Sequence, residues 1–119
     1  YEYIKNKTAE VFYNPKMATK KLVDKVYEIA NTNELTIRLV LMAKSAIRHN
    51  MSQDLPKIKS PVCLIWGKQD TVTPPHVAEE FHRLIPNSSL FWIDKCGHAA
   101  MWEHPDKFAT IIKKWMLKA

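Results

Sequence analysis

Two short apolar segments separated by a helical pattern constrain the fold of this chain more than any other feature. The first segment, VCLIW at residues 62–66, is an unbroken apolar run that Gly67 ends, and the second covers Ser89 to Ile93. Such runs are typical of strands buried on both faces, as in a parallel sheet covered by helices. A helical pattern begins at Thr73-Pro74-Pro75 between the two segments, and another follows Pro105. Strand, helix, strand, helix with short loops predicts an α/β fold, a βαβ unit with a covering helix.

The first part of the chain, residues 1–54, has helical periodicity instead. A weak amphipathic pattern covers residues 1–13, Asn14-Pro15 interrupts it, and apolar residues then recur at helical spacing from Leu22 to Ile29. We expect Asn33 to cap a longer helix that ends near His49-Asn50. Its apolar stripe is predicted to comprise Leu35, Leu39, Met42, Ala43, Ala46 and Ile47. A linker with two prolines, residues 55–61, then leads to the first strand, which predicts a boundary between parts 1–54 and 55–119.

Two parallel strands cannot bury both of their apolar faces, and an isolated pair of strands is marginally stable. We therefore expect residues 55–119 to form the edge of a larger sheet. Exposed apolar strand faces favour association with another copy of the chain or with another chain, by strand addition, swapping or dimerisation.

The chemistry of the chain is concentrated after the two strands. Asp70 lies four residues past Trp66, and His98 lies five residues past Ile93. Because ligands and catalytic groups gather beyond the carboxyl ends of parallel strands, both side chains are expected at the same rim. An Asp that accepts a hydrogen bond from one imidazole nitrogen leaves the other nitrogen free to take a proton from a nucleophile. Gly97 is expected to let the backbone turn sharply before this histidine.

The residues around Asp70 and His98 form two motifs. The first is L-P-x-I-x-x-P-V-x-L-I-W-G-x-x-D-x-x-x-P from residue 55 to residue 74, and the second is D-x-x-G-H-x-x-x-x-E-x-P-x-x-F from residue 94 to residue 108. Together they resemble the seventh strand, acid loop, histidine loop and final helix of the α/β-hydrolase superfamily. Residues 1–54 resemble, less specifically, the helical cap that many members insert before that strand. The resemblance implies the C-terminal part of an α/β-hydrolase fold, with Asp70 as triad acid and His98 as triad base.

In this superfamily the nucleophile lies on a G-x-S-x-G elbow in the first half of the fold. Neither glycine of this chain has a serine two residues later, since Gln69 and Ala99 occupy those positions. The five serines are expected to be structural, and the chain alone is expected to be inactive. The resemblance implies a C-terminal fragment of a hydrolase that needs no cofactor, with Met101 and Trp102 as weak candidates for contact with a small-molecule substrate. Trp102 is expected to pack against the sheet edge.

Three interpretations of the function remain open, and the missing half of the fold would also decide between a Ser nucleophile and the Asp nucleophile of the similar haloalkane dehalogenases and epoxide hydrolases. The first is a Ser-His-Asp hydrolase of carboxylic esters or similar small apolar substrates. The stretch around Cys96-Gly97-His98 and Trp102-Glu103-His104 also resembles hydrolases of meta-cleavage products, which cut carbon–carbon bonds next to a ketone. Those enzymes commonly carry an aromatic residue after the histidine and an Arg in a cap helix, whereas here Ala99 follows and residues 25–28 read KVYE. The third interpretation is a non-catalytic association module.

Composition excludes several other classes. Only two glycines occur, which rules out a phosphate loop or a dinucleotide-binding fingerprint. The net charge of +6 comes from dispersed lysines, so no nucleic-acid partner is expected. His76, His82 and His104 lack metal-ligand spacing, so no metal site is expected. No apolar run is long enough for a membrane span, and no secretory leader is apparent. Cys63 and Cys96 are expected to be free thiols, and free thiols favour a cytoplasmic location.

Overall fold

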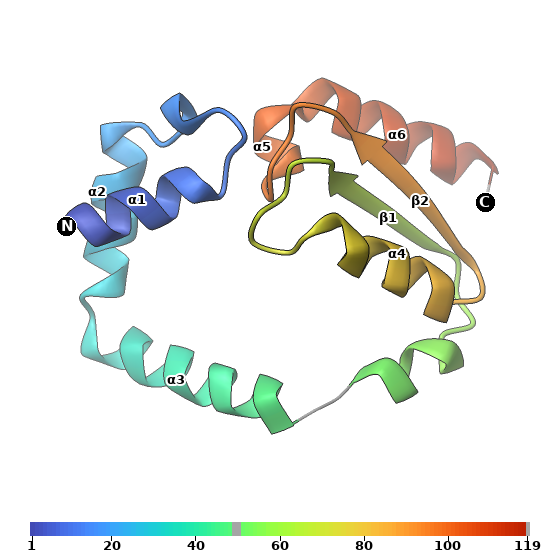
Figure 1. Cartoon of the computed structure of the whole chain (residues 1–119), viewed down its shortest axis with the longest axis horizontal. Helices are drawn as coiled ribbons and strands as arrows, with labels where there is room; N and C mark the ends of the chain where they lie inside the picture. Colours follow the sequence, from blue (N-terminus) through green and yellow to red (C-terminus); the bar gives the residue numbers. More distant parts are fainter. Residues whose placement is uncertain (49–50, 119) are drawn as a thin grey trace.

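The computed structural model describes residues 1–48 and 51–118 of the chain. Helices dominate it, and one small parallel sheet lies in its C-terminal half (Figure 1). The elements in chain order are α1 (Glu2–Glu10), the 3₁₀ turn η1 (Pro15–Met17), α2 (Lys20–Ala30), α3 (Asn33–Arg48), the 3₁₀ turns η2 (Met51–Gln53) and η3 (Leu55–Lys57), β1 (Val62–Gly67), α4 (Pro75–Leu84), β2 (Ser88–Ile93), α5 (Ala100–Glu103) and α6 (Pro105–Lys118).

The sheet consists of β1 and β2, which pair in parallel with Val62 opposite Ser88 and Gly67 opposite Ile93. Helix α4 connects them, and α4 and α6 lie on opposite sides of the two strands (Figure 1). The predicted βαβ unit with its covering helix is therefore confirmed. Parallel pairing also brings the carboxyl ends of both strands to one rim, which is what positions the two loops described below.

The core is small. Ile93, Cys96 and Ala100 form a buried cluster, against which Ile65 and Phe108 pack. Residues 62–66 are only half-buried, although their unbroken apolar run is typical of a strand buried on both faces. The difference arises because two strands and two helices leave part of each strand without a neighbour, as expected for the edge of a larger sheet.

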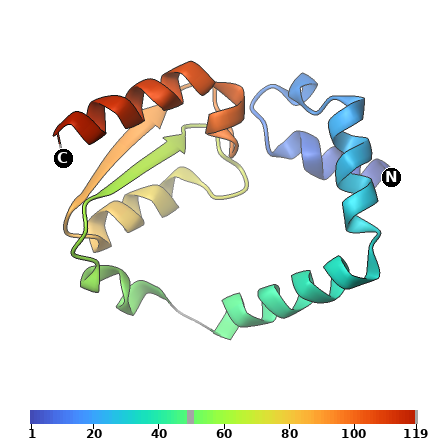
Figure 2. The same ribbon diagram turned by 180° about the vertical axis from the view of Figure 1, so that it is seen from behind.

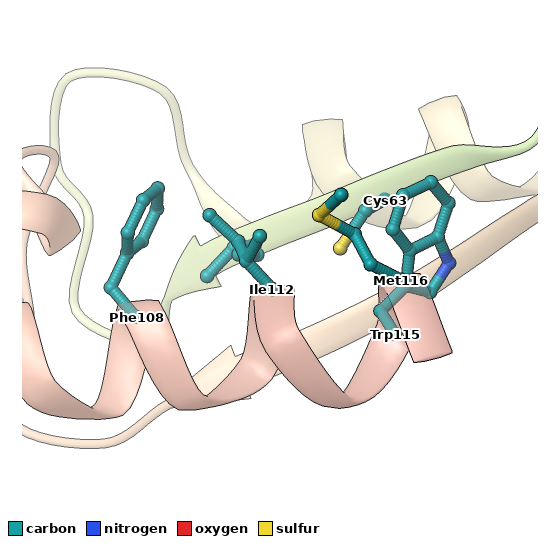
Figure 3. Close-up of a pocket in the computed structure, with 6 residues that line it drawn as sticks. Cys63, Phe108, Ile112, Trp115 and Met116 are labelled. Atoms are coloured by element: carbon teal, nitrogen blue, oxygen red, sulfur yellow. The ribbon is translucent and has the colours of Figure 1, made fainter. Parts of the chain in front are cut away.

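An apolar pocket of about 390 Å³ lies between β1 and α6, where the side chains of the strand are incompletely covered. Figure 3 shows Phe108, Ile112, Trp115 and Met116 projecting from α6 beside Cys63 of β1. The sulfur of Cys63 is a free thiol, as is that of Cys96, so the prediction of unpaired cysteines is confirmed.

Helices α1, α2 and α3 form the N-terminal arm of the molecule, which Figure 2 shows from behind. Thr19 caps α2 through its side chain, which accepts a hydrogen bond from the Leu22 N–H, and Asn14 likewise begins η1. The expected cap at Asn33 was wrong, because Asn33 is already the first residue of α3 and the carbonyl oxygen of Thr32 accepts from the Thr36 N–H.

The side chains of residues 31–46 are all exposed, including the predicted apolar stripe of α3 from Leu35 to Ala46. Met42, for example, is 69% exposed. The last member of the stripe, Ile47, and the expected helix end at His49-Asn50 lie outside what the structure describes. The amphipathic pattern therefore predicted the helix correctly, but its apolar face has no cover within the described chain.

Candidate active site

Asp70 and His98 meet at the rim where both strands end. Asp70 belongs to the loop after β1, His98 belongs to the loop after β2, and His98 Nδ1 lies 2.9 Å from Asp70 Oδ2. The Asp70 side chain is 4% exposed, whereas that of His98 is 43% exposed. The carboxylate is thus enclosed behind an imidazole that faces the open side of the rim.

The Asp70 carboxylate accepts four hydrogen bonds. Its Oδ1 accepts from the backbone N–H groups of Val72 and Thr73, at 2.9 and 3.0 Å, and its Oδ2 accepts from the Thr73 hydroxyl and from His98 Nδ1, both at 2.9 Å. Burial acts to raise the pKa of Asp70, but the Thr73 N–H, the His98 imidazole, the Thr73 hydroxyl and the Val72 N–H together hold that pKa below its usual value. Asp70 is therefore ionised at neutral pH and can only accept hydrogen bonds.

Gln69 connects the two loops. Its side-chain amide donates to Asp94 Oδ1 at 2.9 Å and accepts from the Cys96 N–H at 3.0 Å, while its own N–H donates to the Cys96 carbonyl at 3.0 Å. Lys95 adopts a left-handed backbone with φ of 52°, within a bend just after β2. Sequence inspection missed the bridging role of Gln69, because nothing in the pattern marks a side chain that spans two loops.

Gly97 is required for space and not for the sharp turn that we expected. Neither glycine has a positive φ. A Cβ atom on Gly97 would lie 2.6 Å from the Val11 carbonyl oxygen, and a Cβ atom on Gly67 would lie 2.1 Å from the Gly97 carbonyl oxygen. The end of β1, the histidine loop and the segment after α1 are therefore packed backbone against backbone, with no room for a side chain.

The segment Glu10–Asn14, here called the seam, joins the N-terminal arm to both loops. The Val11 carbonyl accepts from the His98 N–H at 2.8 Å, and the Glu10 carbonyl accepts from the Thr71 hydroxyl at 3.3 Å.

Glu103 of α5 completes this junction. Its Oε1 accepts from the N–H groups of Gly97 and Tyr13 at 2.8 and 3.0 Å, and its Oε2 accepts from the Asn14 N–H at 3.2 Å. One carboxylate thereby ties the histidine loop to the seam.

A second apolar pocket, of about 340 Å³, lies beside the histidine loop between α1, α2 and α5. It is lined by Ile4, Lys7, Thr8, Val11, Phe12, Leu22, Val26, Ala99 and Trp102. The expectation that Trp102 packs against the sheet edge was wrong: the side chain is 55% exposed and meets Phe12 edge to face, with ring centres 6.5 Å apart. Met101, the other weak candidate, is also 55% exposed.

A serine does contact a histidine elsewhere in the chain, but not at this rim. Ser88 Oγ lies 2.8 Å from His82 Nδ1 at the start of β2, the opposite end of the sheet from Asp70. Its hydroxyl also contacts the backbone carbonyl oxygens of His82 and Ile85, at 3.2 and 2.9 Å. Because a hydroxyl has a single proton, donating it to a carbonyl oxygen makes this serine a structural link between α4 and β2.

Across residues 1–48 and 51–118, no group of three or more His, Cys, Asp or Glu side chains is placed to hold a metal ion. The helices in this same part of the chain include none that is long and apolar enough to cross a membrane.

Comparison with known proteins places this chain in a family. The model of the α/β-hydrolase fold family matches residues 5–105, which is most of the chain. The chain belongs to the α/β-hydrolase family. Its parallel strand–helix–strand unit and its two loop motifs agree with that assignment.

Solved structures support the same conclusion. An α/β hydrolase from the metagenome of sediments of the Mar Chica lagoon in Morocco is 55% identical, with a TM-score of 0.75 over 83% of this chain and 45% of its own. The meta-cleavage product hydrolase CumD from Pseudomonas fluorescens IP01 is 20% identical and shares the fold, with a TM-score of 0.83 over 98% of this chain and 45% of its own.

Curated relatives of this α/β hydrolase chain include enzymes named for different substrates. A 2-hydroxy-6-oxononadienedioate/2-hydroxy-6-oxononatrienedioate hydrolase from a Pseudomonas species is 29% identical over 94% of this chain and 41% of its own length. Human monoacylglycerol lipase ABHD6 is 31% identical over 85% of this chain and 29% of its own length. The chain therefore spans less than half the length of these relatives.

Proposed function

We propose that the protein carrying this chain is a Ser-His-Asp hydrolase of carboxylic esters with small apolar groups. The contact between His98 Nδ1 and Asp70 Oδ2, at 2.9 Å, is the observation that carries this proposal. Because ionised Asp70 can only accept, Nδ1 must donate, which leaves Nε2 unprotonated and able to accept the proton of a hydroxyl nucleophile. His98 then returns that proton to the leaving group, and Asp70 orients the imidazole and stabilises its charged form.

The nucleophile belongs, in this proposal, to the part of the fold outside this chain. The chain has no G-x-S-x-G elbow and spans less than half the length of its relatives, so residues 55–119 supply only the acid and the base. The half-buried strands and the apolar pocket between β1 and α6 favour a missing N-terminal half of the fold as the partner of the sheet. The 119-residue chain alone is then inactive, residues 1–54 act as its cap, and two free thiols favour a cytoplasmic location.

The pocket between the histidine loop and the N-terminal arm supports an apolar substrate. Apolar side chains dominate its lining, and the cation among them, Lys7, is already paired with Glu10, whose Oε2 lies 2.7 Å from Nζ. A neutral acyl or alkyl group fits such a lining better than a carboxylate, which needs a free cation or donor.

Carbon–carbon hydrolysis is the second candidate, favoured by the Pseudomonas relative that matches 94% of this chain. A substrate of that kind is a dioate with two carboxylates, and the paired Lys7 offers them no free charge in this half of the site. A third candidate is a non-catalytic module that pairs its open sheet with another copy.

Joining this chain to the unmatched part of the Mar Chica hydrolase, with which it is 55% identical, tests the proposal. The folded chimaera is expected to hydrolyse p-nitrophenyl butyrate, and His98→Ala is expected to lower kcat on the order of 10³-fold or more. A dioate meta-cleavage product is expected to be a much poorer substrate than the ester. A well-folded chimaera without turnover, or full activity in the His98→Ala variant, would contradict the proposal.

Native mass spectrometry of the natural protein tests the partner. A complex of this chain with a polypeptide carrying G-x-S-x-G supports the missing half, whereas a homodimer without esterase activity supports the association module.

A further inference from the structure

Thr73 occupies a position between the two residues of the proposed acid–base pair. Its hydroxyl oxygen lies 2.9 Å from Asp70 Oδ2 and 3.0 Å from His98 Nδ1, while Oδ2 and Nδ1 are themselves 2.9 Å apart. The three polar atoms therefore form a closed triangle in which each atom is within hydrogen-bond distance of the other two.

Only two hydrogens are available for the three sides of this triangle, one on the Thr73 hydroxyl and one on His98 Nδ1. If the hydroxyl donated to an unprotonated Nδ1, the nitrogen lone pair would face the anionic Oδ2 at 2.9 Å with no hydrogen between them. If the hydroxyl donates to Oδ2, the Nδ1–H faces two acceptors, Oδ2 and the hydroxyl lone pair. The second arrangement satisfies every atom, and it is the one that leaves Nε2 as the base.

Thr73 is itself held in place from the sheet. Its carbonyl oxygen accepts from the indole N–H of Trp66 at 2.9 Å, and its backbone N–H donates to Asp70 Oδ1 at 3.0 Å. The Trp66 ring contacts Phe81 of α4, with ring centres 6.1 Å apart. The Thr73 backbone is thus tied to β1 through Trp66, whose ring contacts α4.

We propose that Thr73 is a positioning residue of this site, whose hydroxyl holds the Asp70 carboxylate and shares the Nδ1–H so that the His98 imidazole keeps one orientation. The inference rests on the proposed function, since it assigns a role within the same acid–base pair. Thr73 touches neither the substrate pocket nor the reacting atoms; it acts through Asp70 and His98.

The spectroscopic test uses the ¹⁵N-labelled chimaera described above, which contains both halves of the fold, and it needs no turnover. Long-range ¹H–¹⁵N correlations from the carbon-bound ring protons report whether each imidazole nitrogen of His98 is protonated. In its neutral form, the His98 imidazole of the wild type is expected to show a protonated Nδ1 and an unprotonated Nε2. Thr73→Val removes the hydroxyl with little change of shape. Asp70 Oδ2 then accepts more strongly from the Nδ1–H of His98, so the ¹⁵N resonance of Nδ1 is expected to move downfield. Thr73→Ser is expected to keep the wild-type position, as is the control Thr110→Val, which makes the same change on an exposed position of α6.

The kinetic test uses the chimaera described above. Thr73→Val is expected to lower kcat about tenfold, the effect of losing one hydrogen bond to a charged group, with KM within about twofold of wild type. Thr73→Ser is expected to restore kcat to within about threefold of wild type. A His98 Nδ1 resonance unmoved by Thr73→Val, or a kcat equal to that of Thr110→Val, overturns the role of Thr73. An unprotonated Nδ1 in the wild type would instead overturn the acid–base pair on which the proposed function depends.

Discussion

Replacing Glu103 with Ala is expected to loosen the histidine loop and to destabilise the fold, because one carboxylate serves three backbone donors. Oε1 accepts from Gly97 and Tyr13, and Oε2 accepts from Asn14. Tyr13 and Asn14 lie 90 and 89 residues before Glu103 in the sequence, whereas Gly97 lies 6 residues before it.

The magnitude follows from the burial of each donor. Gly97 is buried, so its unpaired N–H is expected to cost about 1–3 kcal/mol. Tyr13 and Asn14 are exposed, so water can satisfy their N–H groups and each loss is expected to cost about 0.5 kcal/mol. Glu103→Ala should therefore lower the free energy of unfolding by about 2–4 kcal/mol, a large share of the stability of a small domain. Glu103→Gln should cost about half as much, because its amide oxygen still accepts but its NH₂ group faces a donor.

Urea denaturation followed by tryptophan fluorescence measures these free energies, and amide hydrogen exchange of Gly97 localises the effect. The control is Glu2→Gln, which changes an exposed glutamate whose partner is Lys5, and it is expected to alter stability by less than about 0.5 kcal/mol. If Glu103→Ala matches this control, or if the Gly97 amide exchanges no faster than in wild type, Glu103 does not hold the loop to the seam.

Two further outcomes follow from titrating groups. Because the pKa of folded Asp70 lies below its usual value, its stabilising contribution is complete above about pH 4 and is lost as the pH falls through the folded pKa. The difference in unfolding free energy between wild type and Asp70→Asn should therefore shrink between pH 5 and pH 2.5 in urea titrations; a constant difference would show that the carboxylate charge is not involved. For the thiols, burial first, then the negative Glu103 and Asp70, raises the pKa of Cys96 to about 11, and its side chain is fully buried. Iodoacetamide at pH 8 should label half-buried Cys63 first and Cys96 only after unfolding, as read by mass spectrometry, and equal labelling rates in the folded chain would contradict the structure.

The strand–helix–strand unit and the two motif residues were predictable because their signals are local. An apolar run with flanking Gly67 and Pro74 predicted β1 and the start of α4, and the parallel pairing that follows places Asp70 and His98 at one rim. Thr73 had a weaker local signal, since a hydroxyl three residues after an Asp is a common turn partner. That pattern could have identified its contact with Asp70, but not its contact with His98.

Contacts between distant backbone segments were not predictable from one sequence. Gly97 suggested a turn, whereas the structure uses it for close approach to the carbonyl oxygen of Val11. Trp102 suggested packing on the sheet, whereas it faces Phe12 across a pocket. In both cases the deciding neighbour lies more than 80 residues earlier in the chain, and no periodicity or composition encodes which backbone meets which.

The seam attaches the N-terminal arm directly to the loops that carry Asp70 and His98. An N-terminal arm attached only by a linker could move without disturbing Asp70 and His98, but here the segment Glu10–Asn14 bonds to the His98 N–H, to the Thr71 hydroxyl and to Glu103. Those contacts tie the His98 backbone and the Thr71 side chain, one residue after Asp70, to the seam. A motion of α1 away from the sheet would break the hydrogen bonds of the seam to the His98 N–H and to the Thr71 hydroxyl. Glu103, which accepts from the buried Gly97 N–H, would also lose its bonds to Tyr13 and Asn14. The beginning of the arm is therefore part of the frame around Asp70 and His98, the proposed acid–base pair.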